Sequence, residues 1–489
     1  MNAAQRDVAR ISHNTKIVVT LGPGSNDLQL LEDMIRAGGL NVVRFNFSHG
    51  TPEFHRENAK LVREAARRCG QEIAILADLQ GPKIRIGKIA GGSIELNQGE
   101  KLVLDADLSG EGTREAVGLD YRDLPKDVAA GDVLWLDDGL LTLTVDSVVG
   151  SKIITTVENS YVLKSNKGIN KRGGGLSAGA LTEKDFRDLQ TAVEIGCDYL
   201  AVSFVKSGED LQLARQKVEE AMAGSSLIRP GLVAKIERVE AIENLDEIIL
   251  ASDGIMVARG DLAVEVGHAA VPALQKRMIR RARELRRFSI TATQMMESMI
   301  TNPVPTRAEV SDVANAVLDG TDAVMCSAET AVGAYPFETV TQMAKICAEA
   351  EKEQDSLIGV AEYVEDCAVS TNLAIASGAV SVARAVRAKA IVALTESGST
   401  AFEISRHNIQ LPIFALTPNV AAQRKMAAYR GVRPMILATS TNHDKAIQQV
   451  EATLLERKIL NRGDQYIITS GSKMRETGST NTLEVLRVE

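Results

Sequence analysis

The sequence predicts an α/β protein: a (β/α)8 barrel with an inserted β-barrel-like domain and a C-terminal open α/β domain. Eight short apolar runs alternate with longer amphipathic stretches between Lys16 and Glu353. Apolar strands that alternate with helices are typical of a parallel sheet. Eight such units are enough to close a barrel, whose active site lies at the C-terminal ends of the strands. A segment with a different pattern of apolar residues interrupts the third unit, and a further α/β pattern follows the eighth unit.

The barrel elements follow one another along the chain. The predicted strands are Lys16–Leu21, Asn41–Phe47, Ile73–Leu79, Tyr199–Phe204, Leu232–Glu237, Gly254–Ala258, Ser289–Gln294 and Ala323–Ser327. The predicted helices include Pro52–Arg68, Glu183–Ile195, Gly208–Ala223, Pro272–Arg287, Arg307–Leu318 and Pro336–Glu353.

After Leu79 the pattern changes to short alternating strands separated by Gly and Asp turns. The strands include Lys101–Leu104, Val133–Leu136, Leu141–Val145 and Lys152–Val157. Asp137-Asp138-Gly139 between two of them is a hairpin signal. An insertion after the third barrel strand is expected to lie over the catalytic face, where a mobile lid can exclude water.

The chain turns acidic and polar around Glu351–Glu365, which predicts a linker. A shorter α/β pattern follows, too short for a second barrel. It comprises helices Cys367–Val386, Ala401–Arg406 and Ala421–Tyr429, and strands Ala390–Leu394, Ile413–Ala415 and Tyr466–Thr469. We therefore divide the chain into a catalytic barrel (1–82 and 171–353), an inserted lid (83–170), a linker (354–366) and a C-terminal α/β domain (367–489).

Composition excludes several classes of protein. The 489 residues carry a formal net charge of −8, which argues against a general nucleic-acid surface. The five cysteines are scattered, without the clusters of a structural zinc site or a disulfide framework. No stretch reaches the ~20 apolar residues that a membrane span needs, and the first residues lack the apolar core of a signal peptide. We expect a soluble, cytoplasmic protein.

Polar side chains gather at the ends of predicted barrel strands. Because side chains alternate along a strand, Arg44, Asn46 and Ser48 share one face of theirs, and Lys235 and Glu237 share one face of another. Glu237 and Asp261 end strands that are neighbours in sequence order, and two carboxylates with room for other oxygens describe a magnesium site. A salt-bridged pair at the barrel rim is the plain alternative.

Lys235 shifts the balance towards function. A buried cation is costly unless it has an anionic partner. A phosphoryl group under transfer requires such a cation to stabilise its developing charge. The planar guanidinium of Arg44 also suits phosphate. The pattern therefore predicts a site for an anionic, phosphorylated substrate.

Other residues extend this prediction. Gly260 allows close approach of the backbone to a ligand, and the amides near it could hold a carboxylate where a helix begins. Thr293 closes its strand, where an ordinary β-branched strand residue is the alternative. Lys83 and Arg85 follow the hinge-like Gly-Pro at the mouth of the insertion and place two positive charges there.

Several runs, in order, resemble pyruvate kinase. They are NVVRFNFSHG (41–50), DLQGPKIR (78–85), Lys235-Ile236-Glu237, MVARGD (256–261), ITATQMMESM (290–299) and PTRAEVSDVANA (305–316). The resemblance covers nearly the whole chain, including Lys167-Gly168-Ile169-Asn170 and Gly478-Ser479-Thr480-Asn481-Thr482. Gly173-Gly174-Gly175-Leu176-Ser177 resembles one bacterial subgroup in particular.

The resemblance implies transfer of phosphate from phosphoenolpyruvate to ADP, giving pyruvate and ATP. It assigns Arg44 to the substrate phosphate, Glu237 and Asp261 to Mg²⁺ (for which Mn²⁺ can substitute), and Lys235 to the migrating phosphoryl group. The matched positions place Gly260, Asp261 and Thr293 at the substrate carboxylate, and Arg85 and Lys167 at the nucleotide phosphates. The family also suggests a homotetramer.

The sequence departs from the family's potassium site. Members that need K⁺ carry Thr after the aspartate of DLQGPK and Glu after its Gly-Pro, where this chain has Leu79 and Lys83. We expect the Lys83 ammonium to occupy the pocket of Asn46, Ser48 and Asp78, so that K⁺ is not required.

A second phosphate site is predicted in the C-terminal domain. Thr395-Glu396-Ser397-Gly398-Ser399-Thr400 resembles the family's effector loop, and hydroxyls with amides at a helix start form a phosphate nest. Ser399 stands where an arginine is usual, which favours a monophosphorylated sugar or nucleotide over a bisphosphate. An ordinary strand-to-helix turn is the alternative.

A Mg²⁺-dependent lyase or aldolase of the phosphoenolpyruvate/pyruvate barrel class remains the competing activity. A third hypothesis is a metabolite sensor without catalytic activity. The presence of every expected catalytic residue argues against it: Arg44, Lys235, Glu237, Asp261 and Thr293.

Overall fold

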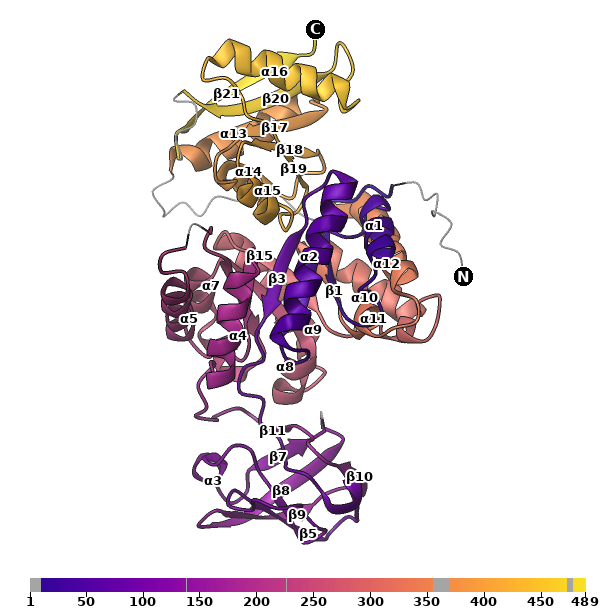
Figure 1. Cartoon of the computed structure of the whole chain (residues 1–489), viewed down its shortest axis with the longest axis vertical. Coiled ribbons are helices and arrows are strands. Elements are labelled where there is room, and N and C mark those ends of the chain that lie inside the picture. The colour runs from indigo at the N-terminus through magenta and orange to yellow at the C-terminus, as the bar shows by residue number, and fades with distance from the viewer. Residues whose placement is uncertain (1–9, 138, 226, 355–369, 473–477) are drawn as a thin grey trace.

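The computed structural model describes residues 10–137, 139–225, 227–354, 370–472 and 478–489. Three parts lie along its long axis, with the barrel in the middle, the inserted domain at one end and the C-terminal domain at the other (Figure 1). None of the helices in these described ranges combines the length and apolar character needed to cross a membrane.

The barrel prediction is confirmed. Eight parallel strands close in the order β1-β16-β15-β14-β13-β12-β3-β2. They are β1 (Lys16–Thr20), β2 (Val42–Asn46), β3 (Ala74–Asp78), β12 (Tyr199–Val202), β13 (Gly231–Ile236), β14 (Gly254–Ala258), β15 (Phe288–Ala292) and β16 (Ala323–Cys326). Every predicted strand is present, and the ends shift by no more than two residues.

Helices surround this barrel and pack on its outer face. They are α1 (Leu28–Arg36), α2 (Pro52–Cys69), α4 (Glu183–Glu194), α5 (Gly208–Ala221), α6 (Val239–Glu243), α7 (Leu245–Ala251), α8 (Arg259–Val266), α9 (Val271–Glu284), α10 (Arg307–Leu318), α11 (Ala328–Ala331) and α12 (Pro336–Gln354). The short η2 (Glu297–Ile300) lies between β15 and α10. Local sequence explains α2 well: Thr51 caps its first turn, Pro52 opens it, and Gly70 at φ +62° ends it.

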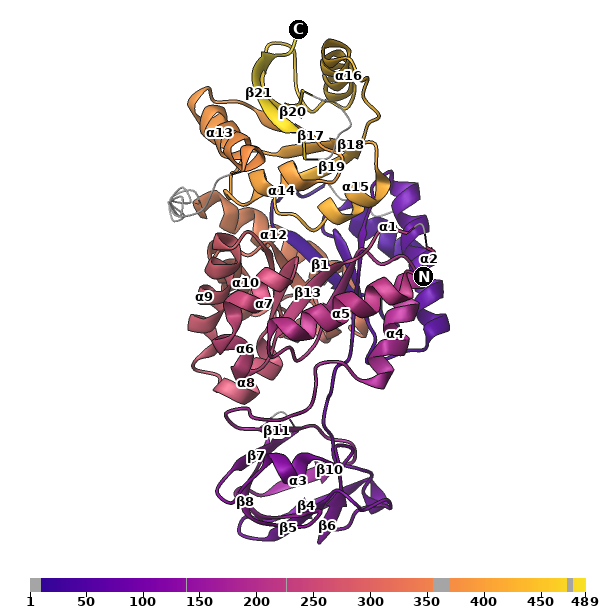
Figure 2. The ribbon, with the colours of Figure 1, turned by 90° about the vertical axis from the view of Figure 1, so that its left-hand side faces the viewer.

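The inserted domain consists of a six-stranded sheet, β11-β7-β8-β9-β5-β6, and a two-stranded sheet, β10-β4. Its elements are η1 (Ala90–Gly92), β4 (Ser93–Leu96), β5 (Lys101–Asp105), β6 (Ala116–Gly118), α3 (Leu124–Asp127), β7 (Val133–Leu136), β8 (Leu141–Val149), β9 (Lys152–Val157), β10 (Tyr161–Lys164) and β11 (Ile169–Lys171). β7 and β8 pair antiparallel around the predicted turn, of which Asp138 lies outside the described residues. The domain has a hydrophobic core of its own and joins the barrel through two extended connections (Figure 2).

The C-terminal domain is an open sheet of order β19-β18-β17-β20-β21, in which only β21 runs antiparallel to its neighbour. Its elements are α13 (Thr371–Ala385), β17 (Ala390–Leu394), α14 (Ser399–Ser405), β18 (Ile413–Thr417), α15 (Val420–Met426), β19 (Val432–Ile436), α16 (His443–Glu456), β20 (Gln465–Gly471) and β21 (Thr480–Arg487). The predicted start of its first helix at Cys367 lies outside the described residues, as does the predicted linker except for Gln354.

The C-terminal domain covers the N-terminal end of the barrel. Ala427 and Ala428 belong to the same hydrophobic cluster as the side chains inside the barrel. Lys425 accepts a hydrogen bond at its carbonyl oxygen from the Tyr199 hydroxyl, 2.8 Å away, and Lys16 Nζ donates to the Val432 carbonyl at 2.7 Å.

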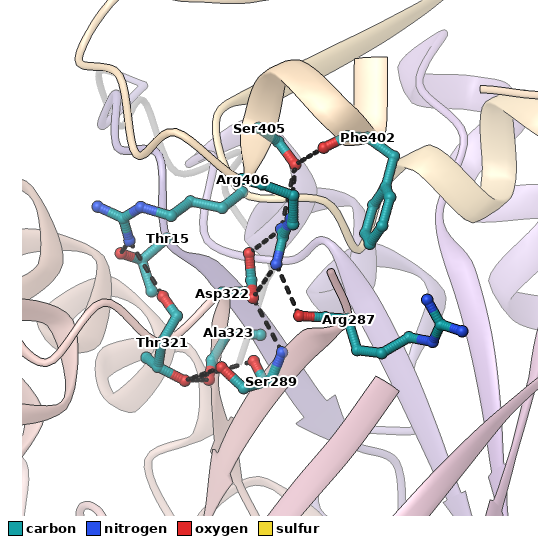
Figure 3. Close-up of polar contacts among 10 residues, drawn as sticks. Thr15, Arg287, Ser289, Thr321, Asp322, Ala323, Phe402, Ser405 and Arg406 are labelled. Atoms are coloured by element: carbon teal, nitrogen blue, oxygen red, sulfur yellow. Dashed lines mark hydrogen bonds and ion pairs between the residues drawn. The ribbon is translucent and has the colours of Figure 1, made fainter. Parts of the chain in front are cut away.

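A buried ion pair reinforces this contact (Figure 3). The guanidinium of Arg406, directly after α14, holds the carboxylate of Asp322, and each side chain is 4% exposed. Asp322 also accepts a hydrogen bond from the Ser289 amide of β15 at 2.9 Å. Because this domain blocks one end of the barrel, the C-terminal strand ends, where the inserted domain is attached, form the accessible face.

Candidate active site

Arg44 lies in the middle of β2, and its side chain is held from two sides. Its Nε donates to Asp78 Oδ2 at 2.6 Å, and its Nη1 donates to Thr20 Oγ1 at 3.1 Å. Asp78 ends the adjacent strand β3 and is 1% exposed, while the Arg44 side chain is 11% exposed. This arrangement fixes the guanidinium and leaves part of its donor fork for a ligand.

Lys235 is the centre of the site. Its Nζ lies 2.6 Å from Ser203 Oγ, 2.9 Å from Glu237 Oε1 and 3.3 Å from Asp78 Oδ1. The side chain is 12% exposed, and the two carboxylates are each 1% exposed. The strand alternation that placed Lys235 and Glu237 on one face thus produces an ion pair between them.

The charges of this cluster control one another. Burial alone would lower the pKa of Lys235, but Asp78 and Glu237 outweigh it and raise that pKa, so the ammonium stays charged. Burial would raise the pKa of Asp78, but Lys235 and Arg44 more than offset it, and that pKa falls. Glu237 differs, because burial and the nearby charge of Asp261 raise its pKa against the opposing effect of Lys235.

Gly260, Asp261 and Thr293 meet where α8 begins. The predicted strand Gly254–Ala258 coincides with β14, but Asp261, which was expected to end that strand, lies with Arg259 and Gly260 in the first turn of α8. The Gly260 amide donates to Thr293 Oγ1 at 2.8 Å, and this hydroxyl donates to the Ala292 carbonyl at 2.6 Å. Thr293 has φ +70°, a conformation that a β-branched residue adopts only at a cost.

The metal prediction can be tested against the donor atoms. Buried Glu237 Oε1 is paired with Lys235 Nζ at 2.9 Å, and Glu237 Oε2 accepts a hydrogen bond from the Phe204 amide at 2.8 Å. Asp261, 28% exposed, opens towards solvent at the first turn of a helix. No group of three His, Cys, Asp or Glu side chains within the described ranges could hold a metal ion by itself. The two carboxylates supply the hard oxygen donors that Mg²⁺ prefers, and they fit an ion whose other ligands are substrate and water.

The potassium-pocket prediction is not reproduced for Lys83. Its Nζ lies 4.0 Å from Asp261 Oδ1, and the described part of the chain shows no contact between Lys83 and Asn46, Ser48 or Asp78. Asn46 Oδ1 instead accepts a hydrogen bond from the Ser48 amide at 3.1 Å. The reason is geometric, since Lys83 follows the Gly81 turn into the connection to the inserted domain and faces α8. Its positive charge still lies at the edge of the site.

Arg85 and Lys167 lie on the two connections to the inserted domain, opposite one another across the bridge between Arg85 and Gly168. Arg85 is half-buried, and its amide donates to Asp120 Oδ1 at 2.7 Å. Lys167 Nζ pairs with Asp137 Oδ1 at 2.8 Å. Both residues therefore lie at the junction between the inserted domain and the barrel.

Three residues of the site were not predicted. Ser203 directly follows β12 and contacts Lys235, and Thr20 ends β1 and contacts Arg44. Arg259 Nη2 donates to the Thr293 carbonyl at 2.6 Å and, through Nη1, reaches Asp312 at 2.7 Å, which fixes the strained turn. The available signal was position: each stands within one residue of a barrel strand's C-terminal end.

The predicted effector loop borders a small cavity in the C-terminal domain. Thr395, Ser397 and Ser399 line it, together with Thr439 and Thr480. Gly398, with φ +89°, precedes α14, and its amide donates to Thr395 Oγ1 at 2.9 Å.

Thr400 does not belong to this lining. It is 1% exposed, and its hydroxyl lies 3.0 Å from Asn372 Oδ1 and 2.7 Å from Thr480 Oγ1. As the second residue of α14, it turns into the domain core rather than towards the cavity. This structure therefore does not bring the Thr400 hydroxyl into the lining of the cavity.

Comparison with known proteins agrees with this geometry. The family model "Pyruvate kinase, barrel domain" matches residues 12–340, and "Pyruvate kinase, alpha/beta domain" matches residues 373–486. The chain is 51% identical to pyruvate kinase II of Salmonella typhimurium over 488 residues, which is 99% of this chain and 100% of that protein. A pyruvate kinase of Haemophilus influenzae is 49% identical over the same shares.

Solved structures lead to the same family. A pyruvate kinase from Cryptosporidium parvum superposes with a TM-score of 0.89 at 36% sequence identity, covering 98% of this chain and 96% of that one. Enzymes of this family transfer a phosphoryl group from phosphoenolpyruvate to ADP and generally use Mg²⁺ and K⁺. These matches favour the phosphotransferase over the lyase or aldolase. This chain, with its closed barrel, its Lys235 cluster and its full-length relatives, is a member of the pyruvate kinase family and catalyses that transfer.

Proposed function

We propose that the cluster around Lys235 performs the transfer of phosphate from phosphoenolpyruvate to ADP. The observation that carries this assignment is a charged ammonium held by one hydroxyl and two carboxylates at the open end of the barrel. In this proposal Arg44 binds the substrate phosphate, because Asp78 and Thr20, which end β3 and β1, hold its guanidinium. Lys235 then stays beside the phosphoryl group as it leaves and stabilises its charge.

Glu237 and Asp261 are the residues that would hold Mg²⁺. The bound ion, for which Mn²⁺ can substitute, would supply positive charge to the oxygens of substrate and phosphoryl group. The chain's own contribution is to keep both carboxylates in place: the Phe204 amide holds Glu237, and the first turn of α8 holds Asp261.

Gly260, Asp261 and Thr293 are proposed to receive the substrate carboxylate. Helix α8 begins there, and amides at a helix start favour an anion. The hydrogen bond from the Gly260 amide to Thr293 Oγ1 is one that a substrate carboxylate can replace or share. Thr293 lies on the side where the enolate carbon receives its proton after phosphate transfer.

The inserted domain supplies the nucleotide contacts in this proposal. Arg85 and Lys167 lie at its junction with the barrel and are proposed to bind the ADP phosphates when the domain closes. Closure would exclude water, which otherwise competes with ADP for the phosphoryl group. A coupled assay tests the function: pyruvate should form only when phosphoenolpyruvate, ADP and Mg²⁺ are all present.

We also propose that the enzyme works without K⁺. Leu79 offers no side-chain oxygen to the ion, and Lys83 places a positive charge 4.0 Å from Asp261. Turnover in a tetramethylammonium buffer free of Na⁺ and K⁺ should match turnover with K⁺. A hundredfold loss that K⁺ restores would refute this proposal. Lys83→Glu should depress activity and make part of the remainder respond to K⁺.

The cavity beside Ser397 and Ser399 is proposed to bind a phosphorylated sugar or nucleotide that activates the enzyme. The hydroxyls of Thr395, Ser397 and Ser399 and the Gly398 turn at the start of α14 support an anionic ligand, and Glu396 also lines the cavity. A cytoplasmic homotetramer is the assembly and location that family membership suggests, and gel filtration with light scattering would test the assembly.

A further inference from the structure

We propose that Ser203 is a positioning residue for phosphoryl transfer, which sets the place of the Lys235 ammonium and ties it to the hinge of the inserted domain. The inference rests on the proposed role of Lys235. It begins from the shortest contact of that ammonium, 2.6 Å to Ser203 Oγ.

The direction of the hydrogen bonds follows from their partners. Ser203 Oγ also lies 2.7 Å from the Leu79 carbonyl oxygen, which can only accept a hydrogen bond. The single hydroxyl proton of Ser203 therefore points to Leu79, and a lone pair of its oxygen accepts from Lys235. Ser203 is 1% exposed, so no water can take over this role without rearrangement.

A neutral partner has a specific effect on Lys235. Its other two contacts are carboxylates, Glu237 Oε1 at 2.9 Å and Asp78 Oδ1 at 3.3 Å. Without the hydroxyl, the ammonium would be drawn towards these two charges and away from the position that faces a substrate. Ser203 holds Nζ without neutralising it, which leaves the charge available to a phosphoryl group.

The turn formed by Ser203 and Phe204 also contacts Glu237, which is proposed to bind Mg²⁺, and Gly81 at the hinge of the inserted domain. Phe204, with φ +55°, donates its amide hydrogen to Glu237 Oε2 at 2.8 Å. Gly81, at the start of the connection to the inserted domain, packs on this turn so closely that a Cβ would lie 2.9 Å from Ser203 Cβ and from Phe204 Cδ2. Leu79, the acceptor of the Ser203 proton, lies two residues before Gly81. Movement of the hinge is thereby transmitted to the cation that stabilises transfer.

The test compares Ser203→Ala with Ser252→Ala. Ser252 is 2% exposed and donates to the Ile249 carbonyl at 3.0 Å, but it lies after α7, away from the site. We expect Ser203→Ala to lower kcat at least about tenfold while changing KM for phosphoenolpyruvate less than about threefold, because the lost contact acts in the transition state. Ser252→Ala should keep wild-type kinetics.

Two further measurements separate positioning from a folding defect. Ser203→Thr keeps the hydroxyl and should retain at least about a third of wild-type kcat. Trp135, the only tryptophan, lies in the inserted domain, and its fluorescence should report closure on adding ADP and phosphoenolpyruvate in all variants.

The proposal is overturned if Ser203→Ala keeps kcat within twofold of wild type, if Ser252→Ala loses as much, or if only KM changes. Equal losses in Ser203→Thr and Ser203→Ala would also overturn it. The Lys235→Met variant separates the proposed role of Lys235 from the positioning role of Ser203. If Lys235→Met is active, the role of Lys235 itself is refuted, whatever the result for Ser203→Ala.

Discussion

Replacing Lys235 by Met should abolish turnover and should also lower the free energy of unfolding. The three contacts of the Lys235 ammonium determine the size of both effects. The lost ammonium lies 2.6 Å from Ser203, 2.9 Å from Glu237 and 3.3 Å from Asp78. Removal of one preorganised charge contact to a transition state costs about 3 kcal/mol or more, which is at least a hundredfold in kcat. KM for phosphoenolpyruvate should change far less, because Arg44 remains.

The stability cost comes from the carboxylates that lose their partner. Breaking a buried ion pair from one side costs about 3–5 kcal/mol when the other charge is left alone. Here Asp78 keeps Arg44 at 2.6 Å and Glu237 keeps the Phe204 amide at 2.8 Å. We therefore expect a smaller loss of unfolding free energy, about 1–3 kcal/mol.

The stability loss should also depend on pH. The folded-state pKa of Glu237 is already raised by burial, and losing Lys235 raises it further. A carboxyl with a raised folded pKa contributes stability below its unfolded pKa and loses it as pH rises through the folded pKa. The gap in melting temperature between Lys235→Met and wild type should therefore widen from acidic to alkaline pH.

A coupled lactate dehydrogenase assay at saturating substrates, run well below the melting temperature, measures kcat without interference from unfolding. Lys235→Arg, which keeps the charge, is the matched control. A folded Lys235→Met enzyme with more than about a tenth of wild-type kcat would refute the assignment.

The other predictions concern the metal, the effector cavity and a buried lysine. Glu237→Gln and Asp261→Asn should each lose activity at ordinary Mg²⁺, as wild type does with excess chelator; full activity of either variant would remove that residue from the metal site. Ser397→Ala combined with Ser399→Ala should abolish activation by a phosphorylated sugar or nucleotide and spare basal turnover, as judged by the shift in half-saturation for phosphoenolpyruvate. A normal response would leave the cavity without this role. Burial lowers the pKa of Lys16 to about 7, so the unfolded chain binds the extra proton between that pH and about 10. Unfolding free energy should accordingly rise with pH in this window by up to about 1.4 kcal/mol per unit, and chemical denaturation of Lys16→Met should show a flatter profile.

Sequence reasoning located the barrel because its signal is repeated eight times and is local. It also brought Lys235 and Glu237 together, since strand alternation needs only two neighbouring positions. It failed where a side chain is placed by the chain around it: Lys83 turns towards Asp261, and Thr400 turns into the core. Sequence spacing does not encode where either side chain points. A hinge glycine sets the direction of Lys83, and packing against α13 and β21 sets the direction of Thr400.

The C-terminal domain was predicted less completely, for related reasons. β19 contains Pro434, which argues against a strand in a sheet interior, yet β19 is the edge strand, where a missing amide hydrogen costs little. β21 carries the polar residues Asn481 and Arg487 on exposed positions, and α16 follows a polar stretch, so neither produced the apolar run that identified the other elements.

The three parts of the molecule differ in whether they share their hydrophobic cores. The inserted domain keeps its hydrophobic core to itself, whereas Ala427 and Ala428 complete the core inside the barrel, and Arg406 neutralises the buried Asp322 there. Removing the inserted domain would cut two connections and would leave no buried charged group without its partner. Removing the C-terminal domain would open the barrel floor and leave Asp322 without its cation. The inserted domain is thus packed as a separate unit, whereas the barrel and the C-terminal domain share a buried core and a buried ion pair, so we expect these two to unfold together.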